Sequence, residues 1–189
     1  MTDWNAWLAD YYTRYDPKSY ASKEVFADLI RFKDLAIKVR EKGGKLIFAG
    51  NGASASIASH GAVDFTKQGK VQSLVFSDSN LITCFSNDYG YDNWMARAIE
   101  FYAGPNDAVV LISVSGTSPS VVRAAEYARS KNLPVVTFTG KTPDNALRKL
   151  GAINFWYDSR SYNVVECVHM MWITTAIDMV VGKAEYSVS

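Results

Sequence analysis

Two short runs rich in glycine and hydroxyl residues carry the groups with the clearest chemistry. The first covers residues 50–56, Gly-Asn-Gly-Ala-Ser-Ala-Ser, and the second covers residues 113–120, Ser-Val-Ser-Gly-Thr-Ser-Pro-Ser. Each run follows an apolar stretch and precedes a helix-like stretch. A tight turn from strand to helix leaves backbone N–H groups and hydroxyls free at the positive end of the helix, which suits a phosphate. The two runs together predict a phosphorylated ligand held mainly by neutral donors.

The first run also matches a second phosphate-binding pattern. Gly50, Gly52 and Ala55 fit the dinucleotide fingerprint G-x-G-x-x-G/A. Asp78 follows the next expected strand, where a ribose partner would stand. A nicotinamide-dependent oxidoreductase is therefore an alternative, but such an enzyme needs no set of hydroxyls after its third strand. The pattern GxxxxGK[ST] is absent from the sequence, which disfavours a nucleotide triphosphatase.

The elements that position these runs alternate between strand and helix. Two of the expected strands, 109–112 and 135–138, are continuous apolar runs, which are typical of strands covered on both faces. Expected strands cover residues 45–49, 73–76, 108–113, 134–139 and 153–157, and the helices that follow them cover 54–66, 91–101, 118–130, 144–150 and 164–181. This alternation predicts an α/β fold, a doubly wound parallel sheet of five strands with helices on both faces. Both hydroxyl runs then lie at the carboxyl ends of strands, where such sheets bind ligands.

The N-terminal part is expected to add two helices. The first, residues 4–15, has a wide aromatic face and ends before Pro17, and the second covers residues 22–41 and is closed by Gly43 and Gly44. The aromatic face consists of Trp4, Trp7, Leu8, Tyr11 and Tyr12. A terminal helix with such a face usually docks onto its own core or onto a second subunit.

Composition excludes several classes of function. The chain has 189 residues, is 48% hydrophobic and carries a net charge of +1, so we expect one globular domain without a basic nucleic-acid-binding face. We see no secretion signal and no apolar stretch as long as a membrane span, so we expect a cytoplasmic protein that does not contact a membrane. Cys84 and Cys167 stand in apolar surroundings and are expected to be reduced core residues, without the spacing of a metal–thiolate site.

The order of the motifs resembles the sugar-isomerase (SIS) domain proteins, in particular the phosphoheptose isomerase group, which includes the DnaA initiator-associating protein. The resemblance extends over about residues 44–181. It rests on residues 49–54 with His60 downstream, and on residues 78–81, 86–91, 113–118, 139–141 and 166–169. It implies a flavodoxin-like sheet in a single SIS domain, residues 1–189. Residues 1–42 would pack in a homotetramer whose sites are shared between subunits, and residues 44–182 would form the sugar-phosphate-binding core.

The resemblance also implies which residues contact the phosphorylated sugar. Val114 replaces the usual threonine of the family, so one hydroxyl is missing. The implied substrate-binding residues are Asn51, Gly52, Ser54, Asp88, Ser113, Ser115, Thr117, Ser118 and Glu166.

The positions that would perform isomerisation depart from the family. Its isomerases move a proton between C1 and C2 of an aldose–ketose pair through an enediol, which needs a base and an acid partner. The family glutamate is Asp64 here, one methylene shorter, and a shift of about 1 Å at a reacting group can cost about a hundredfold in rate. The family histidine is Thr174, which is no acid or base near neutral pH. His169, three residues after Glu166, is a second candidate for the acid, and its alternative role is helix packing.

The family site can also hold a divalent metal such as Zn²⁺. The corresponding residues here are His60, Asp64 and Glu166, with Thr174 at the fourth position. His60 and Asp64 are four residues apart on one expected helix face, a reasonable pair of ligands. The alternative is a local hydrogen bond between them.

Three functions follow from the sequence. The first is a phosphoheptose isomerase acting on sedoheptulose 7-phosphate. The second is a sugar-phosphate sensor or partner-binding regulator without catalysis, which the loss of histidine at Thr174 supports. The third is the nicotinamide-dependent oxidoreductase.

Overall fold

A computed structural model describes residues 2–185 and residue 187. Its centre is a five-stranded, all-parallel sheet with the strand order β2-β1-β3-β4-β5. The strands are β1 (Leu46–Gly50), β2 (Ser73–Val75), β3 (Ala108–Ser113), β4 (Val135–Thr139) and β5 (Ile153–Trp156). This order is the flavodoxin-like doubly wound topology, so the predicted fold class is confirmed.

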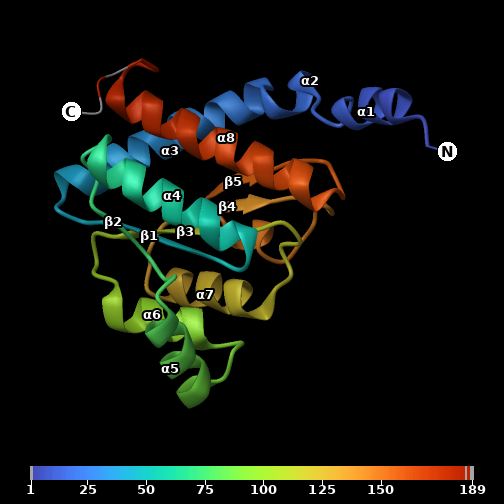
Figure 1. The fold of residues 1–189 in the computed structure, drawn as a ribbon. Helices are drawn as coiled ribbons and strands as arrows, with labels where there is room; N and C mark the ends of the chain where they lie inside the picture. Colours follow the sequence, from blue (N-terminus) through green and yellow to red (C-terminus); the bar gives the residue numbers. More distant parts are fainter. Residues whose placement is uncertain (1, 186, 188–189) are drawn as a thin grey trace.

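Helices cover both faces of the sheet (Figure 1). One layer consists of α3 (Lys23–Glu41), α4 (Ala53–Lys67) and α8 (Tyr162–Val181), and the other consists of α5 (Ser79–Tyr89), α6 (Trp94–Tyr102) and α7 (Pro119–Ser130). Each layer has its own apolar cluster against the sheet. The middle strands β1, β3 and β4 are buried at every position, because both faces are covered.

The N-terminal segment extends from this body. Helix α1 (Trp4–Tyr12) has no buried residue and projects beyond the sheet, and α2 (Pro17–Tyr20) connects it to α3 (Figure 1). Pro17 does not simply end a helix, as the sequence predicted; it stands at the first position of α2, where the missing N–H costs nothing. Tyr157 holds this segment to the body, since its hydroxyl donates to the Arg14 carbonyl at 2.8 Å.

Two elements differ from the sequence prediction. Helix α5 was not predicted; Asp78 begins it by accepting hydrogen bonds from the backbone N–H groups of Asn80 and Leu81. The helix predicted over 144–150 is only a short 3₁₀ turn, η1 (Arg148–Leu150). There the Asn145 side chain bonds the local backbone and so competes with a regular helix.

The cysteine prediction was wrong in part. Cys84 and Cys167 are both free, as expected, but both are exposed and not in the core. Cys84 lies on α5, none of whose residues is buried, and Cys167 lies on α8 beside the buried Val168. The apolar neighbours in sequence point to the other faces of these helices, because adjacent residues of a helix do not share a face.

Helix α8 is long and apolar enough, by length and composition, to cross a membrane, contrary to the expectation that no stretch reaches that length. Its composition follows from its place in the core, where it packs against α3 and α4. The buried residues of α8 are Val164, Val165, Val168, His169, Trp172, Ile173, Ala176 and Ile177.

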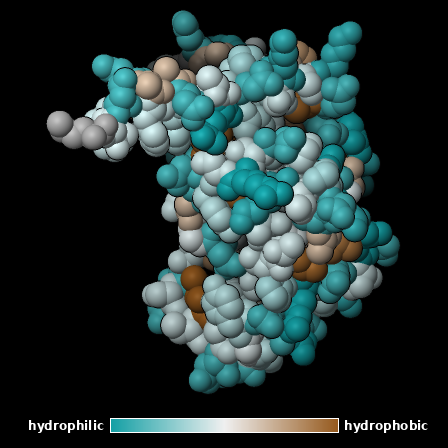
Figure 2. All heavy atoms as spheres, turned by 90° about the vertical axis from the view of Figure 1, so that its right-hand side faces the viewer, coloured by the Kyte–Doolittle hydropathy of each residue, from teal (hydrophilic) through white to brown (hydrophobic). Residues whose placement is uncertain are grey.

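The side of the molecule that carries α1 is mostly hydrophilic or intermediate, with small separate hydrophobic patches (Figure 2).

Candidate functional site

The two hydroxyl runs meet in one cavity of about 120 Å³ at the carboxyl ends of β1 and β3. From β1 the chain winds outward to β2, and from β3 it winds the other way to β4 and β5. The crevice between β1 and β3 is therefore the topological switch point, where doubly wound sheets bind ligands. The lining residues are Asn51, Ser54, Ile112, Ser113, Val114, Ser115, Ser118, Tyr162 and Glu166.

The helices that begin at this cavity have open N-termini. Helix α4 begins at Gly52, whose φ is 57°, and α7 begins at Ser118, and neither residue forms a side-chain cap. The N-termini of α1, α2, α3 and α5 are instead closed by the side chains of Asp3, Asp16, Ser22 and Asp78, whereas α6 and α8 also lack a side-chain cap. Uncapped backbone N–H groups at a positive helix end are the donors that a phosphate accepts. Both helix ends are thus free of side-chain caps, but Pro119 at the first position of α7 has no N–H, and the Ser54 and Ala55 N–H groups of α4 donate to the Asn51 and Gly52 carbonyls.

The serines of the cavity are arranged as donors. Ser54 and Ser113 are buried, and the Ser113 Oγ accepts the Gly116 N–H at 3.3 Å. The Ser115 Oγ accepts the Thr117 N–H at 3.3 Å. A hydroxyl that accepts from the backbone keeps its own O–H for another partner. These O–H groups can therefore point at the oxygens of a bound anion.

Glu166 introduces a carboxyl group into this neutral site. Burial raises the pKa of Glu166 above its usual value, because the charged form loses solvation. Tyr162 stands beside it in the lining, and the Lys141 Nζ donates to the Tyr162 hydroxyl at 2.9 Å. The cavity thus has a carboxyl group in its wall and an ammonium group bonded to one of its lining side chains.

The structure brings together most of the predicted substrate contacts, but not all. Asn51, Ser54, Ser113, Ser115, Ser118 and Glu166 line the cavity. Gly52, Thr117 and Asp88 are exposed and do not line it. Asp88 accepts from the Asn87 side chain at 3.0 Å. These three residues keep the predicted role only as a proposal.

The predicted catalytic residues Asp64 and Thr174 lie farther along the same helices. Asp64 Oδ2 is 3.2 Å from His60 Nε2, so these two side chains form a local pair on α4. Asp64 is ten residues beyond Ser54 on α4, a rise of about 15 Å, and Thr174 is eight residues beyond Glu166 on α8, a rise of about 12 Å. The Thr174 hydroxyl donates to the Met170 and Met171 carbonyls of its own helix.

The residues of one chain do not fit the predicted metal site. Within residues 2–185 and 187, no group of three His, Cys, Asp or Glu side chains could hold a metal ion. The reason is the spacing on the helices: Glu166 lies at the cavity, whereas the His60–Asp64 pair lies farther along α4.

His169 is in the core and does not line the cavity, which contradicts its prediction as a replacement acid. It is fully buried on α8, and its Nε2 lies 3.0 Å from the Thr139 carbonyl. A carbonyl only accepts, so Nε2 carries the hydrogen. Burial lowers the pKa of His169 to about 4, and the ring packs edge-on against Phe138. The alternative role, helix packing, accounts for these contacts.

Sequence reasoning missed two tyrosines at the site and the apolar lining residue Ile112. Tyr162 lines the cavity, and the Tyr91 hydroxyl donates to Asn51 Oδ1 at 3.0 Å. Tyr91 stood within the motif of residues 86–91 but was given no role. Tyr162, as the first residue of α8, could have been found by its position at a helix N-terminus near the sheet edge.

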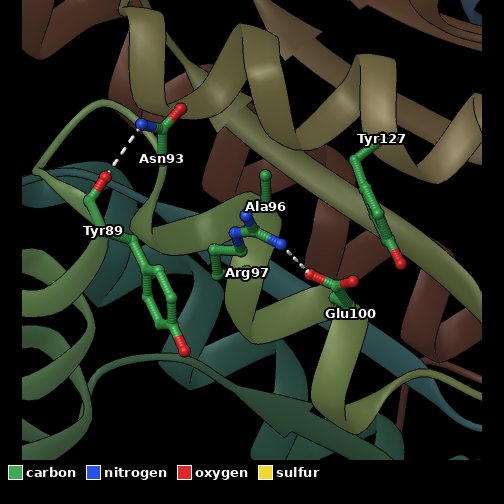
Figure 3. Close-up of a pocket in the computed structure, with 6 residues that line it drawn as sticks. All are labelled: Tyr89, Asn93, Ala96, Arg97, Glu100 and Tyr127. Carbon is green, nitrogen blue, oxygen red and sulfur yellow. Dashed lines mark hydrogen bonds and ion pairs between the residues drawn. The ribbon is translucent and has the colours of Figure 1, made fainter.

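Larger cavities lie elsewhere, away from the carboxyl ends of β1 and β3. One of about 270 Å³ lies between α6 and α7 and is lined by Tyr89, Asn93, Ala96, Arg97, Glu100 and Tyr127 (Figure 3). Its Arg97 is already engaged, because its guanidinium donates to Glu100 at 2.6 Å and lies 5.1 Å from the Tyr89 ring centroid. Asp78, the expected ribose partner, is likewise engaged as the cap of α5.

The fold and the site define a doubly wound α/β protein with a hydroxyl-lined cavity at its switch point. Residues 19–140, well over half of the chain, match the SIS domain family, so the chain belongs to that family. The prediction from the motifs is confirmed at this level.

Similar proteins include several named phosphoheptose isomerase. The one from Solidesulfovibrio magneticus is 39% identical over 106 residues, which are 53% of this chain and 52% of the relative, so the match spans about half of that relative's length. The one from Fusobacterium nucleatum is 31% identical over 142 residues, 72% of this chain and 73% of the relative. The solved phosphoheptose isomerase from Neisseria gonorrhoeae has the same fold, with a TM-score of 0.85 at 23% identity, over 95% of this chain and 99% of that one.

Proposed function

We propose that this protein binds a phosphorylated sugar in the hydroxyl-lined cavity and acts as a phosphosugar isomerase, with sedoheptulose 7-phosphate as the substrate class. The observation that carries the proposal is the convergence of Ser54, Ser113, Ser115 and Ser118 on the open N-termini of α4 and α7. Such donors suit a phosphate group. The relatives named phosphoheptose isomerase support the choice of sugar.

The size of the cavity supports the proposal that it binds only the phosphate end of the ligand, while the sugar lies outside it. At about 120 Å³ it is smaller than the 300–1,000 Å³ of usual ligand pockets, so it suits the phosphate end of the ligand. The remainder of the sugar would extend along α4 and α8 toward Asp64. There the Asp64 carboxylate is the candidate base that takes the proton from one carbon of the aldose–ketose pair and returns it to the other.

The proposed assembly is a homotetramer with sites shared between subunits. The exposed aromatic face of α1 supports an oligomer, because apolar side chains exposed on one helix usually pack against a partner. A partner subunit would also enlarge the small cavity and add side chains to the site. We propose a cytoplasmic location for this assembly.

One observation favours a second candidate, a sugar-phosphate sensor without catalysis. The Thr174 hydroxyl is bonded into its own helix and His169 is buried, so the acid partner of the reaction has no replacement among these two residues. The phosphate-binding part of the site is unaffected by these changes. Binding and turnover therefore have to be measured separately.

The test is titration calorimetry with sedoheptulose 7-phosphate, followed by a coupled isomerase assay with and without Zn²⁺. Ser54→Ala and Ser118→Ala each remove a donor to a charged group and should weaken binding about tenfold or more. Ser130→Ala, at the other end of α7, is the matched control and should bind normally.

The outcomes separate the candidates. Binding with turnover supports the isomerase, and binding without turnover supports the sensor. No binding of the sugar phosphate, together with stabilisation by NAD, would overturn both and favour the oxidoreductase. Unchanged affinity in the two serine variants would contradict the assignment of the cavity.

A further inference from the structure

Asn51 presents an amide group to the cavity, and that amide has two partners within the protein. Its Nδ2 donates to the Ser120 Oγ at 3.1 Å, and its Oδ1 accepts from the Tyr91 hydroxyl at 3.0 Å. An asparagine amide has two N–H donors and one oxygen. Two of these groups are thus engaged by the protein, and one N–H of Asn51 is left for a ligand.

The amide needs both partners to keep this orientation. The terminal torsion of asparagine is broad and has no strong preference of its own. If the amide turned over, its oxygen would replace the free N–H and repel a phosphate. Ser120 is buried near the start of α7, and its hydroxyl can accept from the amide or donate to it. The Tyr91 phenol is a better donor than acceptor, so it is the partner that favours Oδ1 on its own side.

Tyr91 can hold the amide because its own loop is braced. Gly90, with a φ of 80°, ends α5, and Asn93 donates back to the Tyr89 carbonyl at 2.8 Å (Figure 3). Arg123 donates to the Asn93 Oδ1 at 2.7 Å and lies 3.6 Å from Asp92.

Helix α7 connects the Asn51 amide to the loop that carries Tyr91. Arg123 and Ser120 stand one turn apart on this helix, so the loop that carries Tyr91 and the serine that receives Asn51 are positioned by the same element. The site and the α5–α6 connection therefore form one hydrogen-bonded unit. Because Asp92 and Asn93 of this loop both contact Arg123, the loop holds Tyr91 at a defined position. The Tyr91 side chain itself is about half exposed.

We propose that Tyr91 is a positioning residue of the phosphosugar site, which orients the Asn51 amide so that its free N–H faces the phosphate. This inference rests on the proposed function. Tyr91 acts through Asn51 and forms no bond to the substrate. Its hydroxyl, and not its ring, is the group that matters.

The test is the full-length Tyr91→Phe variant, which removes only the hydroxyl. Its affinity for sedoheptulose 7-phosphate should fall about threefold to tenfold, the effect of one hydrogen bond. Tyr102→Phe is the matched control, since Tyr102 is exposed at the end of α6 and its ring packs on Phe76. It should bind like the unmodified protein.

A double-mutant cycle distinguishes positioning from a general structural effect. In an Asn51→Ala background, Tyr91→Phe should cause no further loss of affinity, because the group it orients is gone. An equal loss in both backgrounds, or normal affinity of Tyr91→Phe alone, would overturn the proposal.

Crystal structures of the ligand-free Tyr91→Phe and Tyr102→Phe variants give a readout that does not depend on the ligand. The structures are determined by neutron diffraction, which distinguishes the amide oxygen from the amide nitrogen. The Asn51 amide should turn or move in the first variant and keep its orientation in the second. An Asn51 amide that keeps both its position and its orientation in Tyr91→Phe overturns the inference. If the unmodified protein binds no sugar phosphate, the proposed function fails, and these structures still decide whether Tyr91 orients Asn51.

Discussion

The two histidines of the chain lie in opposite environments. His60 is exposed on α4 and pairs with Asp64, whereas His169 is fully buried on α8 with its Nε2 on a backbone carbonyl. From residue type alone, His169 was a candidate acid and His60 a candidate metal ligand. Burial decides the difference, because the charged form of a buried imidazole loses its solvation. His169 is therefore a neutral core residue at neutral pH.

We predict that His169 makes the protein sensitive to acid. Burial lowers its pKa from 6.5 to about 4, so the unfolded chain binds this proton at higher pH than the folded protein. The stabilising effect of the neutral ring is complete above pH 6.5 and is lost as the pH falls toward 4. The loss should approach about 3 kcal/mol of unfolding free energy below pH 4.

Urea unfolding between pH 4 and pH 7.5 measures this effect. His169→Gln should show a smaller decrease in stability over that range than the unmodified protein, although its stability at pH 7.5 is lower. The same pH dependence in both proteins would contradict the prediction.

At the scale of elements, the turn from β3 to α7 forms much of the cavity wall. Gly116 in this turn has a φ of 62°, and a Cβ there would lie 2.0 Å from the Asn145 Oδ1. The Gly116 carbonyl also accepts from the Leu147 N–H. The residues after β4 thus pack directly on this hydroxyl-rich turn and define its shape.

We predict that Gly116→Ala is more destabilising than Gly43→Ala. Both glycines have a positive φ, but a Cβ at Gly43 would meet no atom within 4 Å. Gly43→Ala should therefore cost only the left-handed backbone penalty of about 1–2 kcal/mol. Gly116→Ala adds the clash with Asn145 and should also weaken sugar-phosphate binding. Thermal unfolding and calorimetry measure both effects, and equal losses of stability would argue against the clash.

Most elements could be predicted because their signals are local. The apolar runs of β3 and β4 and the serine before α3 are readable from neighbouring residues. Helix α5 was missed because its start signal, Asp78, was interpreted as a ribose contact. Leu81, Ile82 and Phe85 pack against the core at helical spacing and could have indicated this helix.

At the scale of the whole molecule, the N-terminal segment is the part whose aromatic side chains stay exposed in the single chain. Trp4 is 63% exposed and Trp7 is 46% exposed, and the rings of Trp7 and Tyr11 stack on each other. Burying such side chains stabilises a contact by about 1.5–3 kcal/mol each. The N-terminal segment is therefore the part of the chain most suited to hold the proposed assembly together.

We predict that replacing both Trp4 and Trp7 with serine lowers the oligomeric state. Light scattering coupled to size-exclusion chromatography gives the mass directly. Asn5→Ser, on the same helix, is the matched control and should leave the mass unchanged. A mass of the double variant equal to that of the unmodified protein would show that α1 does not hold the oligomer.

The sequence by itself determined the fold class and the place of the two hydroxyl-rich turns at strand ends, because these depend on residue type and on local order along the chain. Only the tertiary structure decided which of the candidates meet. It brought Asn51, Ser54, Ser113 and Glu166 to one switch point, placed His169 in the core, and added Tyr91 from a loop forty residues away from its partner. The physical reason is that burial and hydrogen-bond partners depend on how distant segments pack, which the pattern of any one segment does not contain.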